Sequence, residues 1–208
     1  MSQPGLRDLK REATSRALAN AALELAIERG MDGFIVDEVA QRAGFSRRTF
    51  ANHFACKEEA VAHAAILINT ELQPEAEQLL DDIQDNASLL ELLQQLMQMQ
   101  LTAELFGRMR LVLRLSKTHP TLEPYILSAF RHLQTSAFQF LRQVAPERYP
   151  EAYVHMLIGA VYGAVFPVLE GSLPVRLREA ADEEDSDAAP VPFEQYLETV
   201  FSYLRHGF

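Results

Sequence analysis

The sequence has very little cysteine. Of its 208 residues only Cys56 carries a thiol, which excludes an intramolecular disulfide framework and suits a reducing compartment. No segment approaches the roughly 18 consecutive apolar residues of a membrane span. The polar N-terminal segment lacks the apolar stretch of a secretory signal. These absences predict a soluble cytoplasmic protein that does not enter a membrane.

Motifs that mark enzymes and metal sites are missing as well. The sequence contains no glycine-rich phosphate loop, no nucleophile elbow and no carboxylate pair beside a base. Its six histidines include no i, i+4 pair and have no cysteine partner, so neither a metal nor another cofactor is expected. No alternating pattern typical of a β-strand emerges. We therefore expect an all-α protein that is not an enzyme.

Basic residues are outnumbered over the whole chain but not in its first part. The net charge is −10 at pH 7. Residues 1–57 carry nine Lys and Arg against seven Asp and Glu, a net charge of +2, whereas residues 58–208 carry ten against 22, a net charge of −12. A small DNA-binding domain on an acidic body shows this asymmetry.

The stretch Val36–Lys57 has the pattern of a helix-turn-helix. Apolar residues recur at helical spacing in its first half, at Val36, Val39, Ala40 and Ala43. Gly44 is expected to break this helix, because glycine adopts the positive φ of a sharp turn. Ser46 then stands at the N-cap of a second short helix. That helix is predicted to carry Arg47, Arg48, Thr49, Asn52 and His53.

The same region resembles the N-terminal DNA-binding domain of the tetracycline-repressor (TetR) family of bacterial transcription regulators. Many positions match in one register: Ala21–Leu25, Gly30, Val39–Ala40, Ala43–Gly44, Phe45–Ser46, Thr49–Phe50, His53–Phe54 and Lys57–Glu59. The resemblance implies an N-terminal three-helix domain followed by a helical bundle that binds a small-molecule ligand and forms a homodimer. It also implies a repressor that leaves a palindromic double-stranded DNA operator when this effector binds.

Seven residues are expected to contact DNA by their position in that pattern. Arg47 and Arg48 lie where the recognition helix meets DNA, and which of them contacts a base and which a phosphate stays open. Asn52 has the amide that pairs with adenine. The predicted set is Ser46, Arg47, Arg48, Thr49, Asn52, His53 and Lys57.

Two positions depart from the family pattern. Ile35 stands where Ser or Thr usually caps the helix, and Ala51 stands where a Tyr hydroxyl usually contacts a phosphate. Both changes remove a polar group. They keep open an alternative function, a helical ligand-binding or protein-interaction module with a weakened DNA-binding head. A helical enzyme is the more remote alternative.

We predict a DNA-binding domain over residues 1–56 and a ligand-binding and dimerisation domain over residues 57–208. Helices are expected at residues 9–29, 57–72, 122–144, 153–169 and 193–205, with a further one or two over residues 88–118. If there are two, Gly107 is the expected break. Residues 179–190 are acidic and of low complexity, which predicts a mobile linker.

Two sets of residues are expected to serve the body of the protein. Arg110 and His155 are polar groups on apolar helices and need a partner, which a ligand can supply. The predicted ligand site is Met97, Phe106, Met109, Arg110, Phe130, His155, Tyr162 and Phe166. Small residues four apart allow helices to approach closely. The predicted dimer interface is Gly159, Gly163, Tyr196, Val200 and Leu204.

Overall fold

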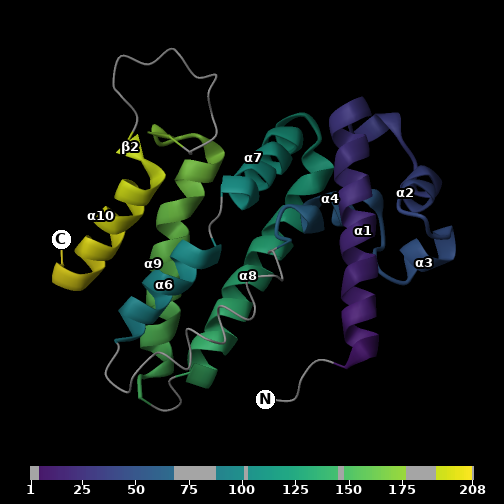
Figure 1. Ribbon diagram of the computed structural model, residues 1–208. Coiled ribbons are helices and arrows are strands. Elements are labelled where there is room, and N and C mark those ends of the chain that lie inside the picture. The colour runs from purple at the N-terminus through teal and green to yellow at the C-terminus, as the bar shows by residue number, and fades with distance from the viewer. Residues whose placement is uncertain (1–4, 68–87, 101–102, 145–147, 177–190, 208) are drawn as a thin grey trace. The chain divides into compact units, whose positions relative to one another are not determined.

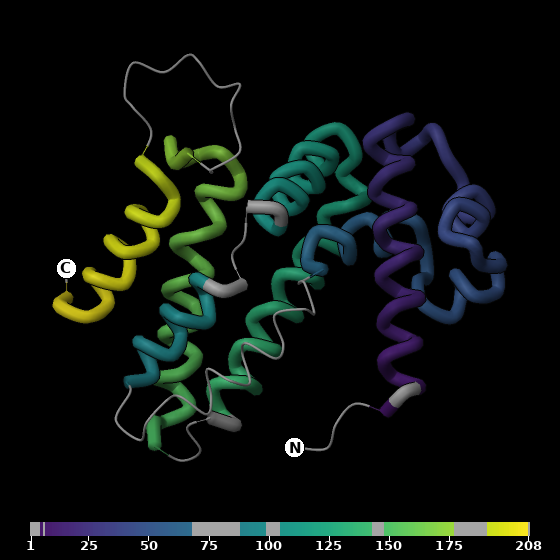
Figure 2. The backbone as a smooth tube through the Cα atoms, viewed as in Figure 1, coloured from purple at the N-terminus to yellow at the C-terminus, as the bar shows by residue number. Residues whose placement is uncertain are grey.

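The structure is a computed structural model that describes residues 5–67, 88–100, 103–144, 148–176 and 191–207 (Figures 1 and 2). The prediction of an all-α protein is confirmed, with one very small sheet in addition. The helices are α1 Leu6–Arg29, η1 Met31–Gly33, α2 Val36–Arg42, α3 Arg47–Ala51, α4 Lys57–Ala64, α6 Leu89–Gln100, α7 Ala103–Thr118, η3 Pro120–Leu122, α8 Glu123–Val144, α9 Glu151–Glu170 and α10 Phe193–His206. The strands are β1 Val175–Arg176 and β2 Val191–Pro192.

The chain forms two compact units. The first comprises residues 1–67 and 111–130, and the second comprises residues 68–110 and 131–208. Helices α7 and α8 therefore contribute residues to both units. The functional boundary that we expect after residue 56 stays a prediction, because compactness alone does not define which residues bind DNA.

The first unit is built on α1, which packs against α2 and α4. Leu18, Ala22 and Leu25 of α1 and Val61 of α4 are almost completely buried. Alanine on the buried faces lets these helices approach closely, and burial of the apolar side chains stabilises the contact. Gly30 ends α1 with a φ of 71°, and its N–H donates to the carbonyl of Ala26 at 3.0 Å.

Helix α4 is shorter than predicted. It ends at Ala64, whereas the apolar periodicity continues to Leu72. After Ala64 the backbone bonds tighten to i−3 spacing, from Ala65 N–H to the Ala62 carbonyl at 3.2 Å and from Ile66 N–H to the His63 carbonyl at 3.1 Å. Periodicity of side chains does not show such a change in the backbone bonds. Residues 68–72 lie outside the described residues.

In the second unit, α10 packs against α6 and α9. Phe193, Leu197 and Phe201 form the buried stripe of α10 at i, i+4 and i+8. The ring of Phe193 lies 4.3 Å from that of Phe106 on α7, measured between centroids. Apart from Ser88, the described residues of the range 88–118 lie in α6 and α7, and Gly107 lies inside α7, so it is not a helix break as predicted.

Helix α9 is the apolar centre of this unit. Among the described residues it alone is long and apolar enough to cross a membrane, a test that the core helix of a soluble protein also passes. Its buried side consists of Val154, Leu157, Ile158, Val161, Val165, Val168 and Leu169. Gly171 ends the helix in the left-handed conformation, with a φ of 78°.

The sequence pattern did not predict a small sheet of four residues. Val175 pairs with Val191 and Arg176 with Pro192 in a parallel arrangement. Two-residue strands are too short to show an alternating pattern, so only the meeting of distant segments reveals them. The predicted acidic linker 179–190 lies between these strands and outside the described residues.

Candidate nucleic-acid interface

The turn between α2 and α3 is set by glycine and serine. Gly44 adopts a φ of 77°, which a residue with a Cβ atom rarely does. The next residue, Phe45, donates its N–H to the Ala40 carbonyl at 2.8 Å. Ser46 caps α3, because its hydroxyl accepts the N–H of Thr49 at 3.1 Å. The predicted turn and N-cap are confirmed.

Helix α3 exposes a polar side and buries an aromatic one. Phe50 is buried, and its ring lies 5.7 Å from that of Phe54 between centroids. Arg47, Arg48 and Ala51 are exposed. The burial of Phe50 therefore anchors a short helix that could not persist alone, since isolated helices of this length are unstable in water.

Two of the residues predicted to lie on this helix lie beyond it. Asn52 is its C-cap residue, and the N–H of His53 donates to the Phe50 carbonyl at 2.9 Å. The prediction that both lie on the second helix was wrong by these two positions. The chain here is already turning to place Phe54 in the core, a tertiary requirement that the local pattern does not show.

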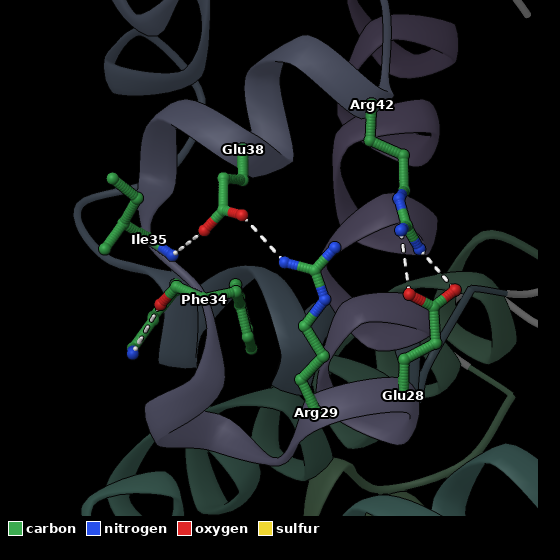
Figure 3. Close-up of polar contacts among 7 residues, drawn as sticks. Glu28, Arg29, Phe34, Ile35, Glu38 and Arg42 are labelled. Carbon is green, nitrogen blue, oxygen red and sulfur yellow. Dashed lines mark hydrogen bonds and ion pairs between the residues drawn. The ribbon is translucent and has the colours of Figure 1, made fainter.

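An ion-pair frame fixes α2 on α1 (Figure 3). Arg42 donates from both terminal nitrogens to the carboxylate of Glu28, at 2.6 and 2.7 Å. Arg29 donates to Glu38 at 2.7 Å. The hydrogen bond from Arg42 lowers the pKa of Glu28 below its ordinary value. Two arginines of the basic N-terminal part are thus used inside the domain and orient α2.

Glu38 also replaces part of the missing cap at Ile35. Ile35 has no side-chain acceptor, but its backbone N–H donates to Glu38 Oε2 at 3.0 Å (Figure 3). This bond, followed by that from Arg29, lowers the pKa of Glu38. Only the reciprocal half of a capping box is formed, and one donor at the start of α2 lacks the usual side-chain acceptor.

The adjacent arginines of α3 have different surroundings. Arg47 Nη1 lies 3.2 Å from Asp37 Oδ2, in the first turn of α2. Arg48 forms no ion pair with any residue that the structure describes. The sequence-based set of contact residues did not include Asp37, because it precedes Arg47 by ten residues and only the turn geometry brings the two together.

Lys57 is engaged inside the domain. Its ammonium donates to the carbonyls of Met31 and Phe34, the latter at 3.0 Å, and lies 4.9 Å from the centroid of the Phe34 ring. Two of its three N–H groups are thereby occupied. The predicted contact between this side chain and a phosphate stays a prediction.

His53 and Cys56 lie just before α4. Partial burial, and then the charge of Arg11, lowers the pKa of His53, which favours the neutral imidazole. Cys56 caps α4, since its Sγ accepts the N–H of Glu59 at 3.4 Å. A hydrogen bond with this thiol raises the pKa of Tyr125 on α8. Tyr125 is a further neighbour of the interface, and it lies too far along the chain for local patterns to indicate.

The predicted ligand residues differ in burial, and four of the eight, Arg110, Phe130, Tyr162 and Phe166, are half-buried. Met97, Phe106 and Met109 are almost completely buried. Burial raises the pKa of Tyr162 to about 12. Phe130 belongs to the first compact unit and the other seven to the second.

Arg110 and His155 differ in how they are satisfied. Arg110 Nη2 donates to the Val168 carbonyl at 3.2 Å, whereas its Nε is buried and has no hydrogen-bond partner among the described residues. His155 lies at the surface, stacked on Phe138 at 4.2 Å between centroids and 3.7 Å from Glu151. Because His155 is exposed, water can satisfy its ring nitrogens, and its predicted contact with a ligand stays a prediction.

The predicted dimer residues lie on α9 and α10. Gly159 and Gly163 are exposed, and a Cβ atom at either would meet no neighbouring atom within 4 Å. The hydroxyl of Tyr196 donates to the Ala164 carbonyl at 2.8 Å and so connects α10 with α9 within one chain. Val200 and Leu204 are half-buried. Within the described part of the chain, no group of three or more His, Cys, Asp or Glu is arranged to hold a metal ion.

Comparison with known proteins supports the interpretation of the N-terminal region. Residues 18–64 match the sequence model of the family described as bacterial regulatory proteins, tetR family. No curated protein matches the sequence.

Solved structures also resemble the chain. A protein assigned to the TetR family of transcriptional regulators, from Mesorhizobium loti MAFF303099, is 18% identical with a TM-score of 0.50, over 93% of this chain and 95% of that one. A transcriptional regulator from Rhodococcus sp. Rha1 is 20% identical with a TM-score of 0.46, over 90% and 91%. The fatty acid degradation regulator FadR from Bacillus halodurans is 13% identical with a TM-score of 0.46, over 100% and 98%. The first of these likenesses shows a shared fold.

Proposed function

We propose that this chain, whose residues 18–64 match the tetR family of bacterial regulatory proteins, acts as a homodimeric transcriptional repressor released from DNA by a small molecule. The observation that supports this best is the exposure of Arg47 and Arg48 on α3, beside the buried anchor Phe50. Proteins of this family are generally non-enzymatic. A regulator of chromosomal genes in bacteria acts in the cytoplasm, where we place it.

The DNA surface consists of α3 and the residues that follow it. Ser46 and Thr49 present hydroxyls at the N-terminus of α3, 2.9 Å apart between their oxygens. Asn52 is exposed and His53 half-exposed directly after the helix. Together with Arg47, Arg48 and Lys57 they supply the donors that phosphates and base edges accept.

Homodimerisation follows from the geometry of DNA. Two recognition helices enter successive major grooves only if they lie about 34–36 Å apart, and a two-fold axis then makes the operator palindromic. An exposed stripe on α9 suits a helix-to-helix contact with a second copy. It contains Met156, Gly159 and Gly163, and the half-buried Val200 and Leu204 lie on α10.

Release by a ligand requires that the ligand bind the DNA-free state of the protein more tightly than the DNA-bound state. The buried Nε of Arg110 is the best candidate contact, since a buried donor without an acceptor costs free energy that a ligand oxygen recovers. A screen of small molecules for release of fluorescent operator DNA tests this step. Arg110→Met is expected to bind the operator and to lose the response.

Selection from random-sequence duplexes tests DNA binding directly. We expect the full-length chain to enrich a palindromic sequence, and Arg47→Ala to weaken that enrichment. A wild-type chain that enriches no sequence would contradict the proposal and favour the alternative, a helical binding module with a weakened head.

Dimerisation has its own measurement, light scattering coupled to size exclusion. Gly163→Glu places a charge in the exposed stripe of α9, and we expect it to give monomers. Thr135→Glu adds the same charge on the exposed face of α8 and serves as the matched control. Equal masses for wild type and Gly163→Glu would place the interface elsewhere.

A further inference from the structure

The two arginines at the front of α3 are both exposed to solvent, but their side chains have different partners. Arg47 Nη1 is 3.2 Å from Asp37 Oδ2, and the two side chains are 74% and 50% exposed. Arg48 has no ion pair with a described residue. An arginine has five N–H donors, so one hydrogen bond to Asp37 leaves four for another partner. Asp37 thus restrains the Arg47 side chain and leaves N–H donors for contact with DNA.

We infer that Asp37 is a specificity-determining residue that positions Arg47 for reading a guanine, while Arg48 contacts phosphate. The inference rests on the proposed function and names the roles of residues within the same surface. Bidentate pairing with guanine O6 and N7 requires a guanidinium held in one plane and direction. A phosphate accepts donors from many directions, so an unrestrained arginine serves it equally well.

The position of Asp37 supports a second effect. Asp37 lies in the first turn of α2, which Glu28, Arg29, Glu38 and Arg42 fix on α1 (Figure 3). The backbone that carries Asp37 is therefore fixed on α1, which keeps its carboxylate within reach of Arg47. Near DNA it repels phosphates, and the repulsion is offset only where Arg47 finds its guanine. An element that penalises wrong partners raises specificity more than affinity.

Full-length protein and in vitro selection from random duplex DNA provide the test. The variants are Asp37→Asn, Arg47→Ala, Arg47→Lys and Arg48→Ala. Asp8→Asn is the matched control, because it removes one carboxylate from the first turn of α1 in the same unit without touching Arg47. Affinities for the selected site, its single-base variants and random DNA are measured at several salt concentrations, and thermal unfolding by circular dichroism checks that each variant is folded.

We expect Asp37→Asn to lose discrimination at one base pair of each half-site and to bind random DNA several-fold more tightly than Asp8→Asn does. Arg47→Ala should lose the same base preference, and the double variant Asp37→Asn/Arg47→Ala should behave like Arg47→Ala at that position. Arg47→Lys keeps the charge and should lose the preference all the same. Arg48→Ala should weaken binding to all sequences alike and reduce the salt slope by about one.

An unchanged base preference in folded Asp37→Asn, with random-DNA affinity no higher than that of Asp8→Asn, overturns the inference. So does loss of the base preference in Arg48→Ala in place of Arg47→Ala. Either result leaves the proposed function intact. A wild-type chain that selects no sequence contradicts the proposed function itself and this inference with it.

Discussion

The ammonium of Lys57 donates to the carbonyl of Phe34 at 3.0 Å and lies over the ring of the same residue, 4.9 Å from its centroid. The first residue of α4 is thereby tied to the segment that leads into α2. Phe34 itself is buried, so the backbone around it has little access to water. Lys57 thus supports the position of the helix-turn-helix from within the domain, whatever it contributes to DNA contact.

Removing this ammonium should destabilise the domain. Lys57→Ala leaves two carbonyls without their donor, and we expect a loss of about 1–3 kcal/mol in the free energy of unfolding. Denaturant titration followed by circular dichroism measures it. Arg48→Ala, exposed and without an ion pair among the described residues, should change stability by no more than about 0.5 kcal/mol. Equal stabilities of the two variants would show that the Lys57 ammonium does not stabilise the domain through these carbonyls.

The positive φ of Gly44 predicts a backbone effect that is free of steric clash. A Cβ atom at Gly44 would meet nothing within 4 Å, so Gly44→Ala is expected to cost about 1–2 kcal/mol from the left-handed conformation alone. Gly107 is equally open but lies inside α7 with no positive φ, and Gly107→Ala should stabilise by about 0.5–1 kcal/mol. Thermal unfolding of both variants gives the sign. A gain in stability for Gly44→Ala would show that the turn differs from the one described.

Glu38 should make stability depend on pH in the acid range. Its pKa is lowered in the folded protein by the Ile35 N–H and by Arg29. A carboxylate of this kind contributes stability above its unfolded pKa, near 4.3, and loses the contribution as the pH falls through the folded pKa. Wild type should therefore be more stable than Glu38→Gln at pH 6, and the difference should vanish at acid pH. Unfolding curves from pH 6 to pH 2 measure this, with Asp8→Asn as a control for removing one acidic group from a first helical turn. A stability difference between wild type and Glu38→Gln that does not change with pH would show that the ionised form of Glu38 does not contribute to stability.

Protonation of His53 should make the affinity for DNA depend on pH. Partial burial and Arg11 lower its pKa, so the neutral form prevails at pH 7.5. A phosphate beside it favours the protonated form, and binding therefore takes up a proton. Affinity for the selected site should rise as the pH falls toward 5.5, by at most about tenfold per pH unit for one proton. Fluorescence anisotropy of wild type and His53→Gln measures the difference, and parallel pH profiles would exclude His53 from the contact.

Local patterns carried most of the information about the elements. Helical periodicity placed α1 and α10 within a few residues, because a buried helix face repeats within one turn. Gly44 and Ser46 indicated the turn and the N-cap for the same reason, since each acts on backbone within about three residues.

Interactions between distant residues were beyond such patterns. The sequence determined that a helix-turn-helix with two leading arginines would form. Only the packed domain decided that Asp37 restrains Arg47, that Lys57 faces the carbonyls of Met31 and Phe34, and that α4 ends at Ala64. The two contacts join residues that are 10 and 26 positions apart in the sequence, so they depend on how helices pack, and packing is a property of the whole core. Residue types therefore predicted the DNA-binding element, and the tertiary structure determined which of its charged side chains contact other residues of the domain.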